Sequence, residues 1–219
     1  SGARVYLPGG AIPATGSIFR QADLAATLRA LVEAERQSAS HGRAAAIYAA
    51  RDRFYRGDIA QRIAKSVQDA GGLMTEADLA GYKGRVEAPT HITFKTRQGT
   101  FEVFKTGFWG QGPVLLQGLA ILQGFDLEGM GHNSTEYIHT VTEALKLALA
   151  DRDEFYGDPD FAKVPAVGLL AESYAAERRK LIDPLAANNQ ARPGDPWKFQ
   201  STAGVKRQVL TASRPGAIS

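Results

Sequence analysis

Residues 133–161, NSTEYIHTVTEALKLALADRDEFYGDPDF, are the stretch of the chain that says most about its fold. Apolar residues recur every three or four positions, as on one face of a helix. Asn133 is the expected N-cap, and Glu136 follows three residues later, as in a capping box. The helix pattern ends in the charged residues 151–154, and a Tyr-Gly-Asp-Pro turn comes directly after them. We therefore predict a long helix whose end is held by charged side chains.

The composition is that of an ordinary globular protein. The chain has 219 residues, 44% hydrophobic and 22% charged, enough apolar material for one domain or most of one. The formal net charge is +3, but the basic residues are scattered, which predicts a solvated surface rather than a nucleic-acid interface. The absence of cysteine excludes disulfides and thiolate metal sites. No apolar run approaches the roughly 18 residues of a membrane span, so no membrane association is expected.

Four helical segments are predicted before residue 85. They start near Gln21, cover residues 44–50, start near Asp58 and end at Gly71 and Gly72, and start at Thr75. The last has a capping-box pattern, with Thr75 as the cap and Asp78 in the reciprocal position. The chain begins with Ser1 rather than methionine and without a signal segment, which favours a processing product or a fragment.

The middle of the chain changes character. Residues 85–105 contain β-favouring residues on both sides of an Arg-Gln-Gly turn and predict a hairpin of two strands. After a glycine-rich loop, Pro113 suits the first turn of a helix over residues 114–122, which is apolar almost all round. A further helix is expected over residues 170–182. Residues 184–219 read as an extended tail, with residues 197–199 as its anchor.

This inventory leaves two architectures open, because a sheet of two strands is only marginally stable. The chain is either a helical domain with a small hairpin, or its strands join a sheet supplied by another chain. The apolar helix over residues 114–122 favours the second architecture, since it needs cover on every side.

The sequence contains no familiar catalytic or cofactor motif. Its histidines lack the spacing with which one helix binds a metal, no Gly-x-Ser-x-Gly element occurs, and the glycine-rich stretches match neither phosphate-binding pattern. We therefore expect no metal site and no cofactor. The four histidines are His41, His91, His132 and His139.

Two clusters allow a structural and a functional interpretation. Asp151, Arg152 and Asp153 are either a structural ion network centred on the arginine or carboxylates paired for acid–base chemistry, and the structural interpretation is favoured. Phe108, Trp109 and Gln111 lie in the loop before the apolar helix. They could line a substrate pocket at a helix N-terminus or form a packing corner against a second chain.

Several blocks occur in an order and spacing that resemble the large subunit of γ-glutamyltranspeptidases. They are residues 19–28, 54–60, 71–82, 115–127 and 133–161. The resemblance covers about residues 19–182 and implies an α+β protein with the four-layer αββα fold of N-terminal-nucleophile hydrolases. On this basis residues 1–183 would supply the helical and hairpin portion of one domain shared with a partner chain, and residues 184–219 would lead to a processing site.

The resemblance also implies an activity that needs a second chain. The family's precursor cleaves itself before a threonine, which becomes the N-terminal nucleophile of the small subunit, with its own α-amino group as base. This chain would then be part of a γ-glutamyltransferase-like amidohydrolase or acyltransferase and would carry no catalytic residue itself. Its partners would be that small subunit and a small-molecule amide such as a γ-glutamyl compound.

The chain departs from the family pattern at two places. The segment that carries the family's carboxylate-binding arginine has no counterpart here. Residues 107–113 contain Phe108 and Trp109 where transpeptidases have small residues, which suggests altered acyl specificity, as in cephalosporin acylases or oxamate amidohydrolases. The competing hypothesis is a non-catalytic helical binding module, which would fold alone as a monomer.

Overall fold

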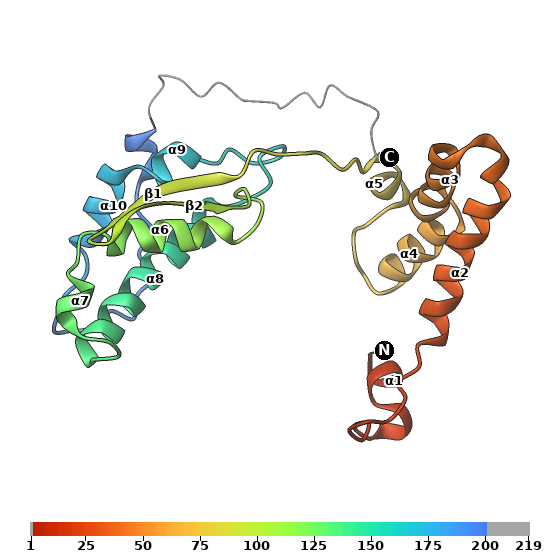
Figure 1. The fold of residues 1–219 in the computed structure, drawn as a ribbon, viewed down its shortest axis with the longest axis horizontal. Helices are drawn as coiled ribbons and strands as arrows, with labels where there is room; N and C mark the ends of the chain where they lie inside the picture. The colour runs from red at the N-terminus through yellow and green to blue at the C-terminus, as the bar shows by residue number, and fades with distance from the viewer. Residues whose placement is uncertain (1, 201–219) are drawn as a thin grey trace. The chain divides into compact units, whose positions relative to one another are not determined.

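A computed structural model describes residues 2–200 and shows an α+β chain, rich in helix, with one antiparallel pair of strands (Figure 1). The chain divides into two compact units, Ser1–Arg85 and Val86–Ser219. The α+β class expected from the sequence is thus confirmed. Residues 201–219, most of the predicted tail, lie outside the described residues.

The described part of the first unit consists of helices. They are α1 (Gly2–Tyr6), η1 (Pro8–Gly10), α2 (Ala22–Gln37), η2 (Ala39–His41), α3 (Arg43–Tyr55), α4 (Asp58–Asp69) and α5 (Glu76–Gly81). The α3 helix is longer than the predicted residues 44–50, and only residues 56–57 separate it from α4. The capping box of Thr75 and Asp78 is confirmed at the start of α5, because each side chain accepts a hydrogen bond from the other residue's backbone.

The interior of the first unit is made mostly of small residues. Helix α3 packs between α2 and α4. The buried hydrophobic residues are Ala46, Ile59, Ala60 and Ala64. By contrast, Leu24 and Leu28, which mark the predicted apolar stripe of α2, stay about half exposed at 50% and 53%. This unit therefore leaves a large part of its apolar surface uncovered.

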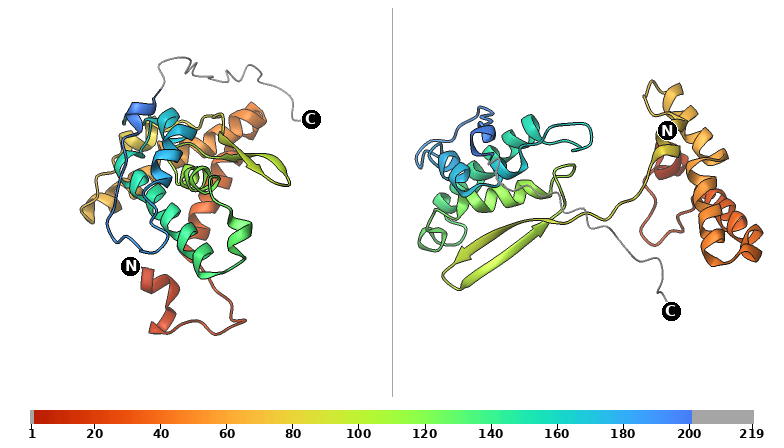
Figure 2. Two further views of the ribbon diagram at one scale, coloured as in Figure 1. Left: turned by 90° about the vertical axis from the view of Figure 1, so that its left-hand side faces the viewer. Right: turned by 90° about the horizontal axis from the view of Figure 1, so that it is seen from above.

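The second unit contains the hairpin and the longest helix. Its elements are β1 (Thr90–Thr96), β2 (Gly99–Lys105), α6 (Gly112–Leu122), α7 (Leu127–Met130), α8 (Thr135–Phe155), α9 (Ala166–Leu169), α10 (Glu172–Arg179) and η3 (Pro196–Phe199). Figure 2 shows the hairpin beside α6, and α6 lies against α8.

The predicted hairpin is confirmed in place and in type. Strands β1 and β2 are antiparallel, and their register pairs Ile92 with Val103 and Thr96 with Gly99, so that residues 97–98 form the turn. Ile92 is buried where β1 contacts α6. The α6 helix begins with Pro113 in its first turn, as predicted, because proline needs no N–H there.

The core of the second unit lies between α6, α8 and α10. Its fully buried members include Leu116 and Ile121 of α6 and Leu147 of α8. Gly118 allows α6 to approach α8 closely, since a Cβ atom there would lie 3.1 Å from the Leu145 side chain. The α6 helix is not buried all round, however: Leu115 is 41% exposed.

Two predicted boundaries are wrong. Asn133 is not the cap of α8: its φ of 57° is left-handed, a conformation that asparagine tolerates better than most residues, and Ser134 accepts the capping hydrogen bond from the Tyr137 amide. The helix expected over residues 170–182 is α10, and it is shorter than predicted. It begins at Glu172, because Ala171 adopts an extended backbone conformation, and it ends at Arg179.

Candidate functional site

The loop before α6 carries the three residues predicted to line a pocket, and the structure places them differently. Phe108 is only 4% exposed and packs edge-on against Tyr156, with ring centroids 4.8 Å apart. Trp109 is 54% exposed, and its indole Nε1 donates a hydrogen bond of 2.8 Å to Glu87. Gln111 accepts a hydrogen bond of 3.1 Å from Arg152. Phe108 therefore packs into the unit, while Trp109 and Gln111 lie at its surface.

The three residues of the predicted ion network do not form one network. Arg152 pairs with Asp153 at the surface, whereas Asp151 pairs with Arg178 in the interior, at 3.1 Å. The physical reason is helix geometry, because successive side chains point about 100° apart around the axis. Arg152 therefore joins the loop before α6 to the end of α8, and Asp151 belongs to a different cluster.

The Asp151 carboxylate is the most completely buried charged group of the second unit. Its side chain has 0% exposure, and three groups donate hydrogen bonds to it. They are Gln117 Nε2 at 3.1 Å, Tyr174 Oη at 2.9 Å and the Gly194 amide at 2.9 Å, and the Arg178 guanidinium forms an ion pair with it at 3.1 Å. Burial raises the pKa of the Asp151 carboxyl, and the Gly194 amide and Arg178 oppose that rise.

Two tyrosines extend this cluster. Tyr174 donates to Asp151, and Tyr156 donates to the side-chain oxygen of Gln117. Burial, and then the nearby Asp151 charge, raise the pKa of both phenols above the ordinary tyrosine value. Both phenols thus stay protonated and act as donors. Hydrogen bonds connect Asp151 through Gln117 to Tyr156. Tyr156 in turn packs on Phe108, which connects this cluster to the loop before α6.

A second buried carboxylate lies two turns earlier on α8. Glu143 is 1% exposed; it pairs with Lys146 and, at 3.2 Å, with Arg192, and it accepts a hydrogen bond of 3.4 Å from the Asn188 amide. Burial acts to raise the pKa of Glu143, but the Lys146 hydrogen bond, the Asn188 amide and the two positive charges outweigh it, so the pKa lies below the ordinary value.

Sequence reasoning missed both interior clusters. Apart from Lys146, the partners of Glu143 and Asp151 lie 23 to 49 residues away in the chain, and no local spacing connects them. One signal was available: both carboxylates fall on the same helix face as the apolar Ala144, Leu147 and Ala148. An acidic residue on the buried face of a helix requires a partner from elsewhere in the fold.

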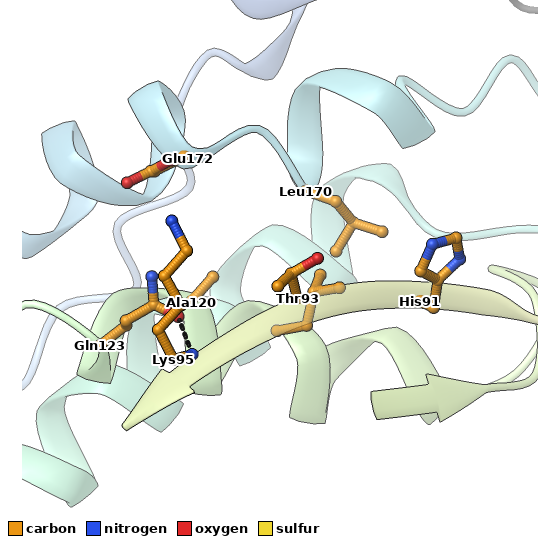
Figure 3. A pocket seen from close by; sticks show the side chains of 8 residues that line it. His91, Thr93, Lys95, Ala120, Gln123, Leu170 and Glu172 are labelled. Atoms are coloured by element: carbon orange, nitrogen blue, oxygen red, sulfur yellow. Dashed lines mark hydrogen bonds between the residues drawn. The ribbon is translucent and has the colours of Figure 1, made fainter. Parts of the chain in front are cut away.

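A separate pocket opens between β1, α6 and the start of α10, with a volume of about 390 Å³ (Figure 3). It is lined by His91, Ile92, Thr93, Lys95, Ala120, Gln123, Leu170 and Glu172. Gln123 accepts a hydrogen bond of 3.0 Å from the Lys95 amide and so occupies part of the outer edge of β1. The pocket has opposite charges on its walls, Lys95 and Glu172, and none of Phe108, Trp109 and Gln111 borders it.

Residues 2–200 show neither a metal site nor a membrane-spanning helix. In this range no group of three or more His, Asp or Glu side chains is placed to hold a metal ion. None of the helices described here is long and apolar enough to cross a membrane. Of the histidines, His139 contacts the Asp183 carbonyl at 2.7 Å, and His91 lies 3.6 Å from Glu102.

Comparisons with known proteins show that this chain is similar to enzymes that are named as proenzymes. Residues 1–213 match the sequence model described as gamma-glutamyltranspeptidase. The glutathione hydrolase proenzyme of Bacillus subtilis subsp. natto is 34% identical over 206 residues, which are 94% of this chain and 32% of that protein. The acylase ACY 1 proenzyme of Pseudomonas sp. strain SE83 is 33% identical over 181 residues, 83% of this chain and 29% of that protein.

A solved structure agrees with these sequence matches. The crystal structure of Helicobacter pylori gamma-glutamyltranspeptidase superposes with a TM-score of 0.63 at 27% identity and covers 87% of this chain and 50% of that one. The chain spans about a third of the length of the curated relatives it matches. Because the family match covers nearly the whole chain, this chain belongs to the gamma-glutamyltranspeptidase family.

Proposed function

We propose that this chain is the large-subunit part of an autoprocessed amidohydrolase or acyltransferase that cleaves γ-glutamyl or related amide bonds. One observation carries the proposal: 94% of the chain aligns with a third of a glutathione hydrolase that is itself named a proenzyme. A chain that is one part of a processed precursor fits this alignment better than a free-standing binding module does.

In this proposal the nucleophile belongs to the partner chain. An N-terminal threonine hydroxyl attacks the amide carbonyl, and its proton passes to the α-amino group of the same residue. The amine leaves with that proton, and an acyl ester remains on the threonine. Water then releases the acid, or an amine takes the acyl group. The chain described here holds and borders the site and forms no bond with the substrate.

The fold would be completed by the small subunit as a four-layer αββα sandwich. The hairpin supports this, because two strands are marginal alone and both Phe101 and Phe104 of β2 are more than half exposed, at 51% and 54%. Residues 1–183 would form the shared domain, and residues 184–219 would lead to the processing site.

We further propose that Trp109 and Gln111 border the substrate, whereas Phe108 supports the loop from inside. Exposure of the indole and its fixed hydrogen bond to Glu87 favour this role. Acyl groups bulkier than γ-glutamyl would contact Trp109, in keeping with acylases among the relatives.

Replacing Trp109 tests this role. In W109A, the ratio of kcat/KM for a γ-glutamyl amide to that for a bulkier acyl amide is expected to change about tenfold, the scale of a lost hydrophobic contact. Phe161→Ala, at a side chain 91% exposed and outside the loop, is the matched control. An unchanged ratio in W109A would remove Trp109 from the site.

The proposed function itself is tested on the full-length protein. Intact mass and N-terminal sequencing after purification are expected to show two chains, the second starting with threonine. A single uncut chain that folds cooperatively without a partner would refute the proposal and favour the helical binding module.

A further inference from the structure

The chain that follows α10 contains no helix between residues 180 and 195, yet it is held along its length by α8. The Asn188 amide and Arg192 donate to Glu143, and the Gly194 amide donates to Asp151. The two carboxylates and these three residues are called the clasp below. The blue segment in Figures 1 and 2 is this returning chain.

Both carboxylates of the clasp are removed from water. Glu143 is 1% and Asp151 0% exposed, and they lie eight residues apart on the same face of α8. Arg178 joins the two ends, because its guanidinium pairs with Asp151 and also donates to the Arg192 carbonyl. Arg192 in turn donates to the Leu181 carbonyl at 2.8 Å, where α10 has just ended.

The chain stays fixed beyond the clasp. The Gln200 side chain accepts a hydrogen bond of 2.8 Å from the Gly168 amide, and Phe199 packs against Tyr174 at 5.4 Å between ring centroids. A Cβ atom at Gly168 would lie 2.0 Å from the Pro196 carbonyl, so only glycine permits this approach. These contacts hold residues 196–200 against α9 and α10.

Stability alone does not require such a network. Buried ion pairs are often replaced by apolar residues without loss of stability, because desolvation offsets their attraction. Apolar packing does not specify register, because hydrophobic contacts allow one segment to slide along another. A set of directed hydrogen bonds does not allow such sliding. The clasp is thus suited to holding residues 188–194 in one register on α8.

We propose that the clasp is a positioning device for self-cleavage. This inference rests on the proposed function, in which the chain after residue 184 leads to the cut. Cleavage consumes one water and converts one peptide bond into a carboxylate and a new α-amino group. In this proposal the clasp residues take no part in breaking the bond. They fix the point from which the scissile segment starts, and so raise the fraction of precursor in which the reacting groups are aligned.

The test compares rates of self-cleavage in the full-length precursor. Glu143→Gln, Asp151→Asn and Arg192→Met are each expected to slow the first-order appearance of the new N-terminus at least tenfold, measured well below each variant's Tm. Arg192→Lys, which keeps the charge, is expected to restore much of the rate. Arg192 is the safest site, because its side chain is 21% exposed and its loss is least damaging to folding.

Leu147→Ala is the matched control. Leu147 lies between the two carboxylates on α8 and is 1% exposed, and its side chain packs in the apolar core with Ile121 and Ala175. This variant is expected to lower Tm as much as the clasp variants and to cleave within twofold of the wild-type rate. Clasp variants that cleave at the wild-type rate, or slowing by Leu147→Ala equal to theirs, would overturn the inference. A wild-type precursor that never cleaves would instead refute the proposed function.

Discussion

The two compact units use their charges in opposite ways. In the first unit the ion pairs lie at the surface, and several join residues four apart on one helix, such as Arg56 with Asp52 and Lys65 with Asp69. In the second unit, Glu143 and Asp151 lie in the interior and bind groups tens of residues away. Pairs of the first kind add little to a helix that forms without them. The interior pairs determine where distant parts of the chain lie.

This difference predicts very different energetic consequences for substitutions of the same chemical kind. Exposed pairs are screened by water and contribute little. Interior carboxylates that lose a partner leave uncompensated charge in a medium of low dielectric constant.

The largest effect is expected for Asp151→Ala. Removing the carboxylate leaves the buried Arg178 without its counter-ion and frees the Gly194 amide, so the loss of stability is expected to be about 3–5 kcal/mol. This loss of stability is measured by hydrogen exchange of the Gly194 amide in the full-length protein. Asp153→Ala, at an exposed pair on the same helix, is the control, and equal losses in both variants would erase the distinction between interior and exposed charges.

Glu143→Gln tests the second interior carboxylate through pH. Because the folded-state pKa of Glu143 is lowered, its contribution is present above the unfolded value of about 4.3 and is lost as pH falls through the folded pKa. The variant is expected to lose about 1–3 kcal/mol at pH 7, the scale of hydrogen bonds to a charged group, and less at pH 3. Thermal unfolding at both pH values measures this, and a gap that widens in acid would contradict it.

Asp151 is expected to show the opposite pH dependence. Burial raises its pKa in the folded state. Between the unfolded and the folded pKa, the folded state therefore holds a proton that the unfolded state has released, and the free energy of unfolding falls as pH rises through this range. In Asp151→Asn this slope is expected to disappear, which a pH series of thermal unfolding would detect. Persistence of the slope would assign it to another group.

A smaller effect is expected at the capping box of the first unit. In Thr75→Ala, the Asp78 amide loses its acceptor, and its hydrogen exchange is expected to speed up about fivefold, the scale of a lost N-cap. Glu76→Ala, one residue on and outside the box, is the control. An unchanged exchange rate at Asp78 would show that the cap is not what holds this turn.

The smallest effect is expected for Lys65→Ala. The lysine is 75% exposed and pairs with Asp69 on the same helix, so the cost is expected to stay below about 0.5 kcal/mol. Thermal unfolding with and without added salt measures it. A loss near that of Asp151→Ala would mean that surface pairs do hold the first unit together.

Particular elements show how far sequence reasoning reaches. The hairpin, the Pro113 start of α6 and the Thr75 cap were all predictable, because turn residues, proline geometry and capping act over a few positions. The cap of α8 was misplaced by one residue, since Asn133 and Ser134 are both good caps and only backbone conformation separates them. The exact bounds of α10, Glu172 and Arg179, had no local signal.

The candidate site was predictable in part. The loop with Phe108, Trp109 and Gln111 was found from its composition, but not which of the three points inward. Arg152 was identified as a central charge, yet its neighbour Asp151 belongs to a different cluster because it lies on another side of the helix.

The sequence by itself determined the order of helices and strands and the family, since both depend on local periodicity and on blocks in a preserved order. Only the tertiary structure determined where residues 188–200 lie, since their composition is that of a loose tail. Buried carboxylates on α8 bind that segment through directed hydrogen bonds. Such contacts join residues that no sequence period relates, because they depend on where folding brings distant donors and acceptors together.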